Sequence, residues 1–301
     1  AGGGEPVADG GQIAGTAAAE REPGECAGEI GGALQHRPEI GAEMLVANAI
    51  VRDEGEADVI TQDSQMLSIL SLIHRVSDTD LSVLLQGETG TGKKLLAHAI
   101  HRISARRGRT FVTVDCAALP DTLLESELFG HRKGAFTGAI SDRVGLLEVA
   151  DGGTVFLDEI DKAGLPVQRR FLHLLDSGEI RPVGATAYRS LDVRVVCATS
   201  CSDLRQEVAE GRFLKDLYYR LNDIAVVVPA LRERPDDVRL LTDCFVEKFS
   251  RQLGRDVRGV TAAFYDSIRQ HSWPGNVREL EKAIRRAVTL ADPKSWLVPA
   301  L

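Results

Sequence analysis

Five short apolar runs alternate with segments of helical periodicity between residue 58 and Pro229. Near-continuous apolar runs separated by helices are typical of a parallel sheet covered by helices on both faces. The expected strands are Leu81–Gln86, Phe111–Asp115, Thr154–Asp158, Val193–Thr199 and Ile224–Val228. The pattern therefore predicts a doubly wound α/β domain over residues 58–229.

Helical periodicity flanks this region on both sides. Asp63 or Ser64 is placed to cap a helix with a regular apolar face. After Pro229 the strands are expected to stop, and residues 230–301 are predicted to form a small all-helical domain. Its expected helices are Asp236–Leu253 (ended by Gly254), Thr261–His271 and Asn276–Leu290.

Residues 1–57 have a different composition. Eleven of the 29 glycines fall in the first 41 residues, and no Phe, Trp or Tyr occurs before residue 58. Such a segment buries too little surface to offset its ordering entropy, which predicts a flexible linker or tail. Within it, a short helix is expected around Ile40 to Val51.

Composition excludes several classes of protein. The hydrophobic share of 44% and charged share of 27% are ordinary for a soluble globular chain. A net charge of −8 disfavours non-specific DNA binding. No apolar run has the length of a membrane span and no signal peptide is evident, so we expect no membrane partner and a cytoplasmic location. Among five cysteines only Cys197 and Cys201 are close in sequence, which predicts reduced thiols rather than a zinc site.

A glycine-rich loop follows the first predicted strand and precedes a helix. Its residues are Gly87, Glu88, Thr89, Gly90, Thr91, Gly92 and Lys93. Glycines let backbone N–H groups point at phosphate oxygens, and Lys93 adds a positive charge for the β- and γ-phosphates. The residue after this lysine is usually a Ser or Thr that binds magnesium, but in this chain it is Lys94. The context predicts an ATP site rather than a plain turn, and the domain order then indicates an ATPase core followed by a lid.

Two carboxylates end the third predicted strand. Asp158 and Glu159 follow the buried run Thr154–Leu157, at the edge of the sheet that carries the glycine-rich loop. Asp158 is placed to hold Mg²⁺ through water, and Glu159 to orient the attacking water. An Asp-Glu pair on its own could equally be a solvated strand end. The neighbouring phosphate loop favours the catalytic interpretation over that one.

The segment Glu125–Ala139 narrows the class further. It contains the hexapeptide Gly134, Ala135, Phe136, Thr137, Gly138 and Ala139. With Tyr218–Asn222, Leu231–Arg234 and Trp273–Leu280, it resembles the sigma-54-dependent activators, whose GAFTGA loop is intact here. An apolar tip on glycine hinges should protrude rather than lie on its own domain.

The resemblance covers Val59 to Ala291 and implies an AAA+ P-loop NTPase that forms a ring, usually a hexamer. It implies that ATP hydrolysis opens the closed complex of sigma-54 RNA polymerase through Phe136 and Thr137. It also implies that Thr199 senses the γ-phosphate, that Arg278 senses nucleotide from the lid, and that Arg220 reaches a neighbouring subunit's site. Activators of this family generally carry a helix-turn-helix after the lid. Only ten residues follow Ala291, so we expect no DNA-binding domain in this chain.

Several positions depart from the family pattern. Leu214 stands where one of two trans-acting arginines is expected, and Leu cannot stabilise charge on a phosphate. Asp115 replaces an Asn that is thought to restrain the catalytic Glu, and would bring a second carboxylate near Glu159. Lys94 replaces a Glu. Thr61 and Ser200 replace Gly and Asn.

Two hypotheses stay open from the sequence. The first is a ring-forming ATPase that remodels sigma-54 polymerase. The second is a nucleotide-binding regulator of the same fold that hydrolyses ATP poorly because of Leu214. An unrelated AAA+ machine, such as a clamp loader or an unfoldase, would have no reason to keep the GAFTGA loop. The arginines at 106, 107 and 109 are interpreted as a solvated helix end, and the histidines at 98, 101, 131 and 173 as ordinary helix or loop residues.

Overall fold

The five predicted strands form one parallel sheet in the order β4-β5-β8-β3-β9. Their bounds are β3 Val83–Gln86, β4 Phe111–Asp115, β5 Thr154–Asp158, β8 Arg194–Thr199 and β9 Ile224–Val227. The predicted parallel sheet is confirmed, with β4 and β5 at the predicted bounds and the others one or two residues shorter. All four joined pairs are parallel, so the carboxyl ends of all five strands lie at one edge.

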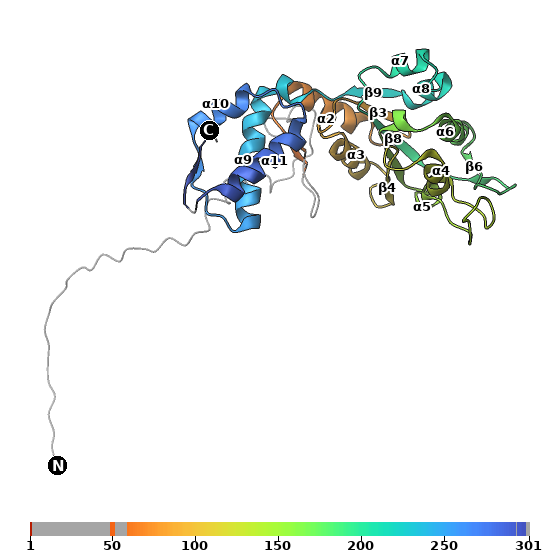
Figure 1. Cartoon of the computed structure of the whole chain (residues 1–301), viewed down its shortest axis with the longest axis horizontal. Coiled ribbons are helices and arrows are strands. Elements are labelled where there is room, and N and C mark those ends of the chain that lie inside the picture. The colour runs from red at the N-terminus through yellow and green to blue at the C-terminus, as the bar shows by residue number, and fades with distance from the viewer. Residues whose placement is uncertain (2–48, 52–58, 293, 299–301) are drawn as a thin grey trace. The chain divides into compact units, whose positions relative to one another are not determined.

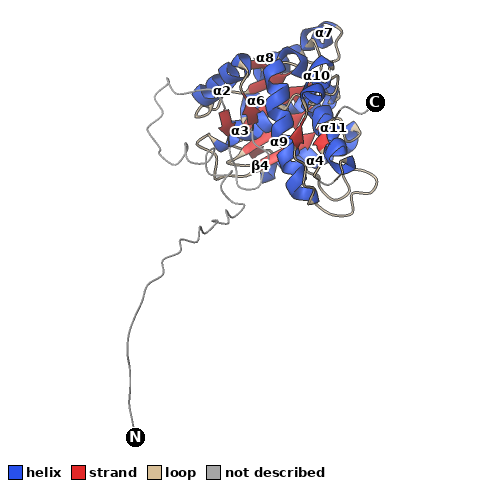
Figure 2. Cartoon of the chain, turned by 90° about the vertical axis from the view of Figure 1, so that its left-hand side faces the viewer, coloured by secondary structure: helices blue, strands red, loops and turns tan. Residues whose placement is uncertain are grey.

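Helices cover both faces of the sheet, as Figure 2 shows with the strands in red and the helices in blue. Alternate side chains of the central strands enter two separate cores. In β5, for example, Val155 and Leu157 belong to one core and Phe156 to the other. The first core is completed by α4 Asp121–Phe129, α5 Leu146–Val149, α6 Leu165–Ser177 and α8 Lys215–Leu221, and the second by α2 Ser64–Val76 and α3 Lys93–Arg102.

The remaining elements of the α/β part are short. β2 Val59–Thr61 precedes α2, η3 Ile160–Lys162 follows β5, and α7 Leu204–Ala209 precedes α8. β6 Glu179–Ile180 and β7 Arg189–Ser190 form an antiparallel hairpin between α6 and β8. The α2 cap is Asp63, whose carboxylate accepts the N–H groups of Gln65 and Met66, both at 3.0 Å.

Three helices form the C-terminal part: α9 Pro235–Leu253, α10 Ala262–Gln270 and α11 Asn276–Leu290, preceded by η4 Leu231–Glu233 (Figure 1). Their predicted positions are confirmed to within a residue or so at each end. The expectation that strands stop after Pro229 is wrong, because β10 Gly259–Val260 pairs in parallel with β11 Trp296–Leu297. Two-residue strands leave no periodic pattern in a sequence. This pair depends on Gly259, where a Cβ would meet the Trp296 ring at 2.8 Å.

The computed structural model describes Ala1, residues 49–51, residues 59–292 and residues 294–298. The described residues from 49 onward belong to one compact unit, which carries everything described below. Most of the predicted linker at residues 1–57 therefore lies outside the described residues. The helix expected around Ile40 to Val51 is wrong at its end, because β1 Ala49–Val51 pairs antiparallel with β2. No helix in the described part of the chain is long and apolar enough to cross a membrane.

Candidate functional site

The phosphate loop joins β3 to α3 at the carboxyl edge of the sheet. Gly87, Gly90 and Gly92 all have positive φ, at 154°, 83° and 103°. At Gly90 a Cβ would collide with the carbonyl oxygen of Gly275 in the lid. Glycine is therefore required at this position both for its backbone conformation and for the close approach of the lid.

Lys93 begins α3 and turns back over the loop. Its Nζ donates to the carbonyl oxygens of Gly87 at 2.7 Å and Glu88 at 3.2 Å. Burial lowers the pKa of Lys93, while the charges of Glu159 and Asp158 act in the opposite direction. The structure thus brings the lysine of the loop into the field of both predicted acidic residues. The next residue, Lys94, is exposed.

Asp158 ends β5, directly beside Asp115 at the end of β4. Burial raises the pKa of Asp158, and the charges of Glu159 and Asp115 raise it further. The Asp115 carboxylate accepts the N–H of Ala117 at Oδ1, at 2.9 Å. The carboxylate that replaces the usual Asn thus lies beside Asp158, and its charge raises the pKa of that residue.

The described residues contain no cluster of three or more His, Cys, Asp or Glu side chains arranged to hold a metal ion. Mg²⁺ keeps several waters and commonly takes one carboxylate together with substrate phosphate oxygens. Asp158, next to the phosphate loop, fits that donor set.

Glu159 follows β5 in a left-handed conformation, with φ 52° and ψ 49°. Its Oε2 accepts two hydrogen bonds from Ser200, from the N–H at 3.0 Å and from Oγ at 2.6 Å. The neighbouring Thr199 donates its hydroxyl to Asp161 Oδ1 at 2.5 Å. Hydrogen bonds thus join the ends of β5 and β8 beside the phosphate loop. Glu159 and Thr199 were predicted as site residues, whereas Ser200 was not.

The lid contacts the phosphate loop directly. Glu88 receives two hydrogen bonds from Arg232, at 2.9 and 2.6 Å, and one from Asn276 at 3.1 Å. These contacts lower the pKa of Glu88 to about 2, with Arg232 the larger cause. The N–H of Val277 also donates to the Gly90 carbonyl at 3.0 Å. Arg232 and Asn276 were not predicted as site residues, although both lie in motif blocks of the resemblance.

Arg278 follows this contact in α11. The Cβ of Arg278 lies 3.2 Å from the position that a Cβ on Gly90 would take, and its charge contributes to lowering the pKa of Lys93. The predicted lid arginine therefore stands beside the loop.

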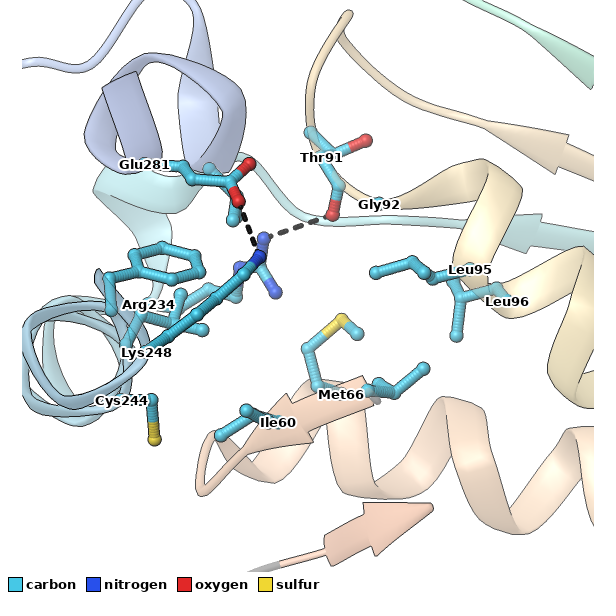
Figure 3. Close-up of a pocket in the computed structure, with 14 residues that line it drawn as sticks. Ile60, Met66, Thr91, Gly92, Leu95, Leu96, Arg234, Cys244, Lys248 and Glu281 are labelled. Carbon is cyan, nitrogen blue, oxygen red and sulfur yellow. Dashed lines mark hydrogen bonds and ion pairs between the residues drawn. The ribbon is translucent and has the colours of Figure 1, made fainter. Parts of the chain in front are cut away.

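A cavity of about 300 Å³ lies next to the loop, between the start of α3, β2 and the lid (Figure 3). Arg234 enters it, and its Nη2 donates to the Thr91 carbonyl at 3.2 Å. Lys248 and Glu281 form an ion pair at 2.8 Å on the lid side. The other walls are largely apolar, which suits a flat heteroaromatic ring. They comprise Val59, Ile60, Met66, Gly92, Leu95, Leu96, Leu241, Cys244, Phe245 and Val277.

The hexapeptide loop lies between α4 and α5 with its tip outward. Phe136 is 41% exposed and meets the His131 ring edge-on, with 5.0 Å between centroids. Gly134 and Gly138 have φ of 81° and 102°, and Thr137 is exposed. The base of the loop is closed by a hydrogen bond from the N–H of Gly134 to the Ala139 carbonyl at 2.8 Å. The two glycines therefore bend a loop whose aromatic tip is only partly covered by its own domain.

Arg220 lies on α8. Its Nε pairs with Asp176 of α6 at 2.7 Å, and both side chains are about half exposed. Leu214 packs partly buried against its own domain's core, while its N–H donates to Gln168 Oε1 at 2.8 Å. Lys215 faces a separate cavity that Tyr219 also lines, on a different side of α8 from the Arg220–Asp176 pair.

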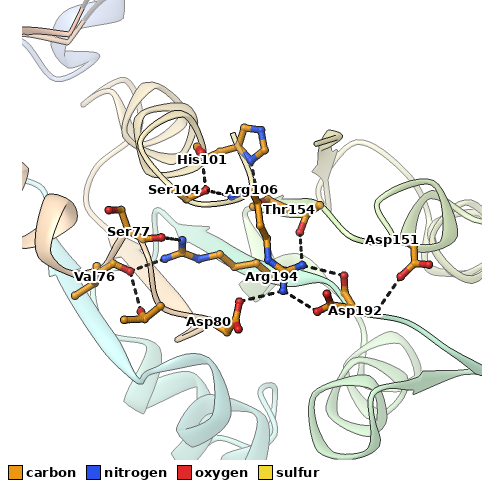
Figure 4. Close-up of polar contacts among 12 residues, drawn as sticks. Val76, Ser77, Asp80, His101, Ser104, Arg106, Asp151, Thr154, Asp192 and Arg194 are labelled. Atoms are coloured by element: carbon orange, nitrogen blue, oxygen red, sulfur yellow. Dashed lines mark hydrogen bonds and ion pairs between the residues drawn. The ribbon is translucent and has the colours of Figure 1, made fainter. Parts of the chain in front are cut away.

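A second polar cluster sits at the opposite edge of the sheet (Figure 4). Arg106 is only 15% exposed and pairs with Asp192 at 2.6 Å and Asp80 at 3.0 Å. Arg194 is buried, and its Nη2 donates to the Val76 carbonyl at 2.9 Å. The solvated helix end predicted from the sequence is thus wrong for Arg106. The cluster fastens segments that precede strands β3 and β8, away from the phosphate loop.

Two family models match the chain. The sigma-54 interaction domain matches residues 59–227, and an AAA+ ATPase lid domain matches residues 232–300. A hydrogenase transcriptional regulatory protein, HoxA of Bradyrhizobium diazoefficiens, is 49% identical over 81% of this chain and 50% of its own length. The transcriptional regulatory protein ZraR of Salmonella typhimurium is 46% identical over 86% of this chain and 57% of its own.

Solved structures with the same fold include NtrX from Brucella abortus. Its complex with ATP has a TM-score of 0.74 and 33% identity, covering 79% of this chain and 52% of NtrX. Its complex with ADP has the same TM-score and 32% identity, covering 80% of this chain and 53% of NtrX. The chain therefore spans about half the length of the curated relatives and solved structures that it matches.

Proposed function

Because this chain belongs to the sigma-54 interaction domain family, we propose that it is the ATP-hydrolysing module of an activator of sigma-54 RNA polymerase. The observation that carries the proposal is the joint presence of a phosphate loop facing two carboxylates and of a protruding GAFTGA loop. An ATPase core alone is shared by clamp loaders and unfoldases, so family membership and the loop together select this function. Since RNA polymerase is cytoplasmic in bacteria, we propose the same location for this chain.

ATP would bind across the loop and the lid. The N–H groups of Gly87–Lys93 and the Lys93 ammonium would hold the phosphates, which pull Lys93 away from the carbonyl oxygens it now contacts. The adenine ring would enter the apolar cavity beside Arg234. Arg278 and Asn276 both belong to the lid and lie beside the phosphate loop, where Asn276 bonds Glu88. The position of the lid would therefore change with the number of phosphates that the loop holds.

Hydrolysis depends mainly on positioning and electrostatics. Asp158 would hold Mg²⁺, whose charge would offset the negative charge of the phosphates. Glu159 would orient the attacking water and polarise it. Thr199, which now bonds Asp161, would lie where the end of β8 meets the γ-phosphate.

We further propose a ring, with six subunits as the expected number, in which Arg220 of one subunit completes the neighbour's site. Its guanidinium is half exposed and held by one surface carboxylate, Asp176, and an exposed pair of this kind is weak. It can therefore be exchanged for a phosphate at small cost. Leu214 leaves each site with one such arginine, so turnover depends on Arg220 alone.

Phe136 and Thr137 at the tip of the hexapeptide loop would contact sigma-54. The base of this loop is linked to the β6–β7 hairpin, because the Arg132 N–H donates to the Val183 carbonyl at 2.9 Å. Both segments lie between elements of the ATPase core, so a shift of β5 or α6 on hydrolysis would move the tip. This gives a physical route from ATP turnover to the closed promoter complex.

The test is the steady-state ATPase rate with magnesium over a range of protein concentrations. A specific rate that rises with concentration and is lost in Glu159→Ala and Arg220→Ala supports hydrolysis at shared sites. Glu247→Ala, on the exposed face of α9, is the matched control and should keep the wild-type rate. ATP binding without turnover at any concentration would refute the motor and favour a nucleotide-binding regulator, and recovery in Leu214→Arg would then identify the missing arginine as the cause.

A further inference from the structure

Glu159 is fixed at both its backbone and its side chain. The left-handed backbone at Glu159 turns the residue out of the β5 alternation, so its carboxylate lies over the end of β8. There the N–H and the hydroxyl of Ser200 both donate to Oε2, at 3.0 and 2.6 Å. The direction of the carboxylate is thus set by a residue that is 41 positions away in the sequence.

The two hydrogen bonds make the two carboxylate oxygens of Glu159 different, because both donors bond Oε2. Two donors on Oε2 occupy its lone-pair directions, and within the described residues no donor bonds Oε1. Water can therefore approach Glu159 only at Oε1. A catalytic base oriented by a third group through a hydrogen bond is a general arrangement of active sites.

No other side chain nearby performs this task. Asp115 directs its Oδ1 to the Ala117 N–H, and Thr199 directs its hydroxyl to Asp161. A carboxylate at position 115 also has no proton to donate to Glu159. The hydroxyl of Ser200 is therefore the one side-chain donor that the described residues offer to Glu159.

We infer that Ser200 is a positioning residue for ATP hydrolysis, which holds Glu159 so that Oε1 faces the attacking water. This inference rests on the proposed function. Ser200 acts through Glu159, so it should affect the chemical step and not ATP binding.

The experiment compares Ser200→Ala, Ser200→Thr and the control Ser202→Ala, which removes an exposed hydroxyl two residues away. Misplacing a reacting group by about 1 Å costs roughly 100-fold, and a general base contributes roughly 10²- to 10⁴-fold. Since the backbone N–H still holds Oε2 in Ser200→Ala, we expect kcat to fall about 10- to 100-fold with KM for ATP within about twofold. Ser200→Thr keeps the hydroxyl and should recover most of the rate, and Ser202→Ala should match wild type.

An unchanged or higher kcat in Ser200→Ala would overturn the inference, as would a loss that appears only in KM. A second measurement does not depend on turnover. The thermal midpoints of Ser200→Ala, Glu159→Ala and the double variant should be non-additive, since the two side chains share a hydrogen bond that each single change removes. Additive midpoints would show that Ser200 and Glu159 do not interact, which would overturn the inference. If the midpoints are non-additive but the wild-type chain does not hydrolyse ATP, the proposed function is refuted and Ser200 is only a structural partner of Glu159.

Discussion

Replacing Thr61 by Val would remove one hydroxyl from a buried polar cluster that joins the α/β core to the lid. The Thr61 hydroxyl donates to Asp237 Oδ2 at 2.7 Å, and both side chains are fully buried. The same carboxylate accepts the N–H groups of Gln62 at 2.7 Å and Asp63 at 3.2 Å, and Arg234 lies 3.5 Å away. Val has almost the shape of Thr, so the change tests the hydrogen bond rather than the packing.

The magnitude follows from the charge and burial of the acceptor. A hydrogen bond to a charged group contributes about 1.5–3 kcal/mol. Three other donors remain near Asp237, so the lower part of that range, about 1.5–2 kcal/mol, is expected for Thr61→Val. For a domain of this size 1 kcal/mol lowers Tm by about 2–4 °C, which predicts a fall of roughly 3–8 °C.

The measurement is chemical and thermal unfolding of Thr61→Val beside Thr289→Val. The control removes an exposed hydroxyl that bonds only the carbonyl of Arg285 within α11, at 2.7 Å, and should change stability by less than about 0.5 kcal/mol. If the two variants unfold at the same midpoint, the buried hydroxyl contributes nothing measurable and the proposed tie between core and lid is refuted. A loss in Thr61→Val with an unchanged m-value supports it.

Three further predictions concern the loop, the lid and the tip. The pKa of Glu88 is lowered by Arg232 from 4.5 to about 2, so its contact stabilises the fold above about pH 4.5 and is lost as the pH falls towards 2. The denaturation midpoints of wild type and Glu88→Gln should therefore differ near neutral pH and converge below about pH 4.5, and a constant difference would contradict this. Gly90→Ala should weaken ATP binding about tenfold or more in a titration, because a left-handed Ala costs roughly 1–2 kcal/mol and its Cβ would collide with Gly275. Phe136→Ala should reduce sigma-54-dependent open-complex formation at least about tenfold while ATPase activity stays near wild type, and parallel loss of both would contradict a role confined to the tip.

The sheet could be predicted because its evidence is local. Each strand is an apolar run bounded by polar residues, and the loop and acidic motif follow two of these runs directly. By contrast, the contacts that organise the site join residues far apart in the chain. Thr61 and Asp237 are 176 positions apart, and Glu88 and Asn276 are 188 apart. Nothing in the periodicity near any of these residues indicates its partner.

For Arg106 and Ser200 the sequence does not predict the partners that surround the side chain in the fold. Arg106 was assigned to a solvated terminus because neighbouring arginines at a helix end are usually exposed, as Arg107 and Arg109 are. Its partners Asp80 and Asp192 come from loops before two different strands, so only the folded sheet brings them together. Ser200 is noted from the sequence only as a replacement of Asn, since its bond to Glu159 depends on β5 and β8 being neighbours.

The charge argument against DNA binding also depends on the part of the chain considered. Residues 1–57 contain 11 of the 44 acidic side chains and 3 of the 36 Lys and Arg. This leaves 33 of each sign in residues 58–301, so the family-matched region is neutral and the whole net charge of −8 belongs to the N-terminal segment. The absence of a basic surface excess still disfavours non-specific DNA binding by this region.

The small β10–β11 pair makes the end of the described chain an integral part of the lid. The carbonyl of Leu297 accepts both the N–H and the hydroxyl of Thr261, at 3.1 and 2.8 Å, and the Leu297 side chain is buried with the lid helices. Residues that follow α11 therefore hold the start of α10 in place through these two hydrogen bonds. A fluorophore attached at the exposed Val298 is therefore expected to move with the lid, so its distance to a second dye on α6 would report any rotation of the lid when ATP is added.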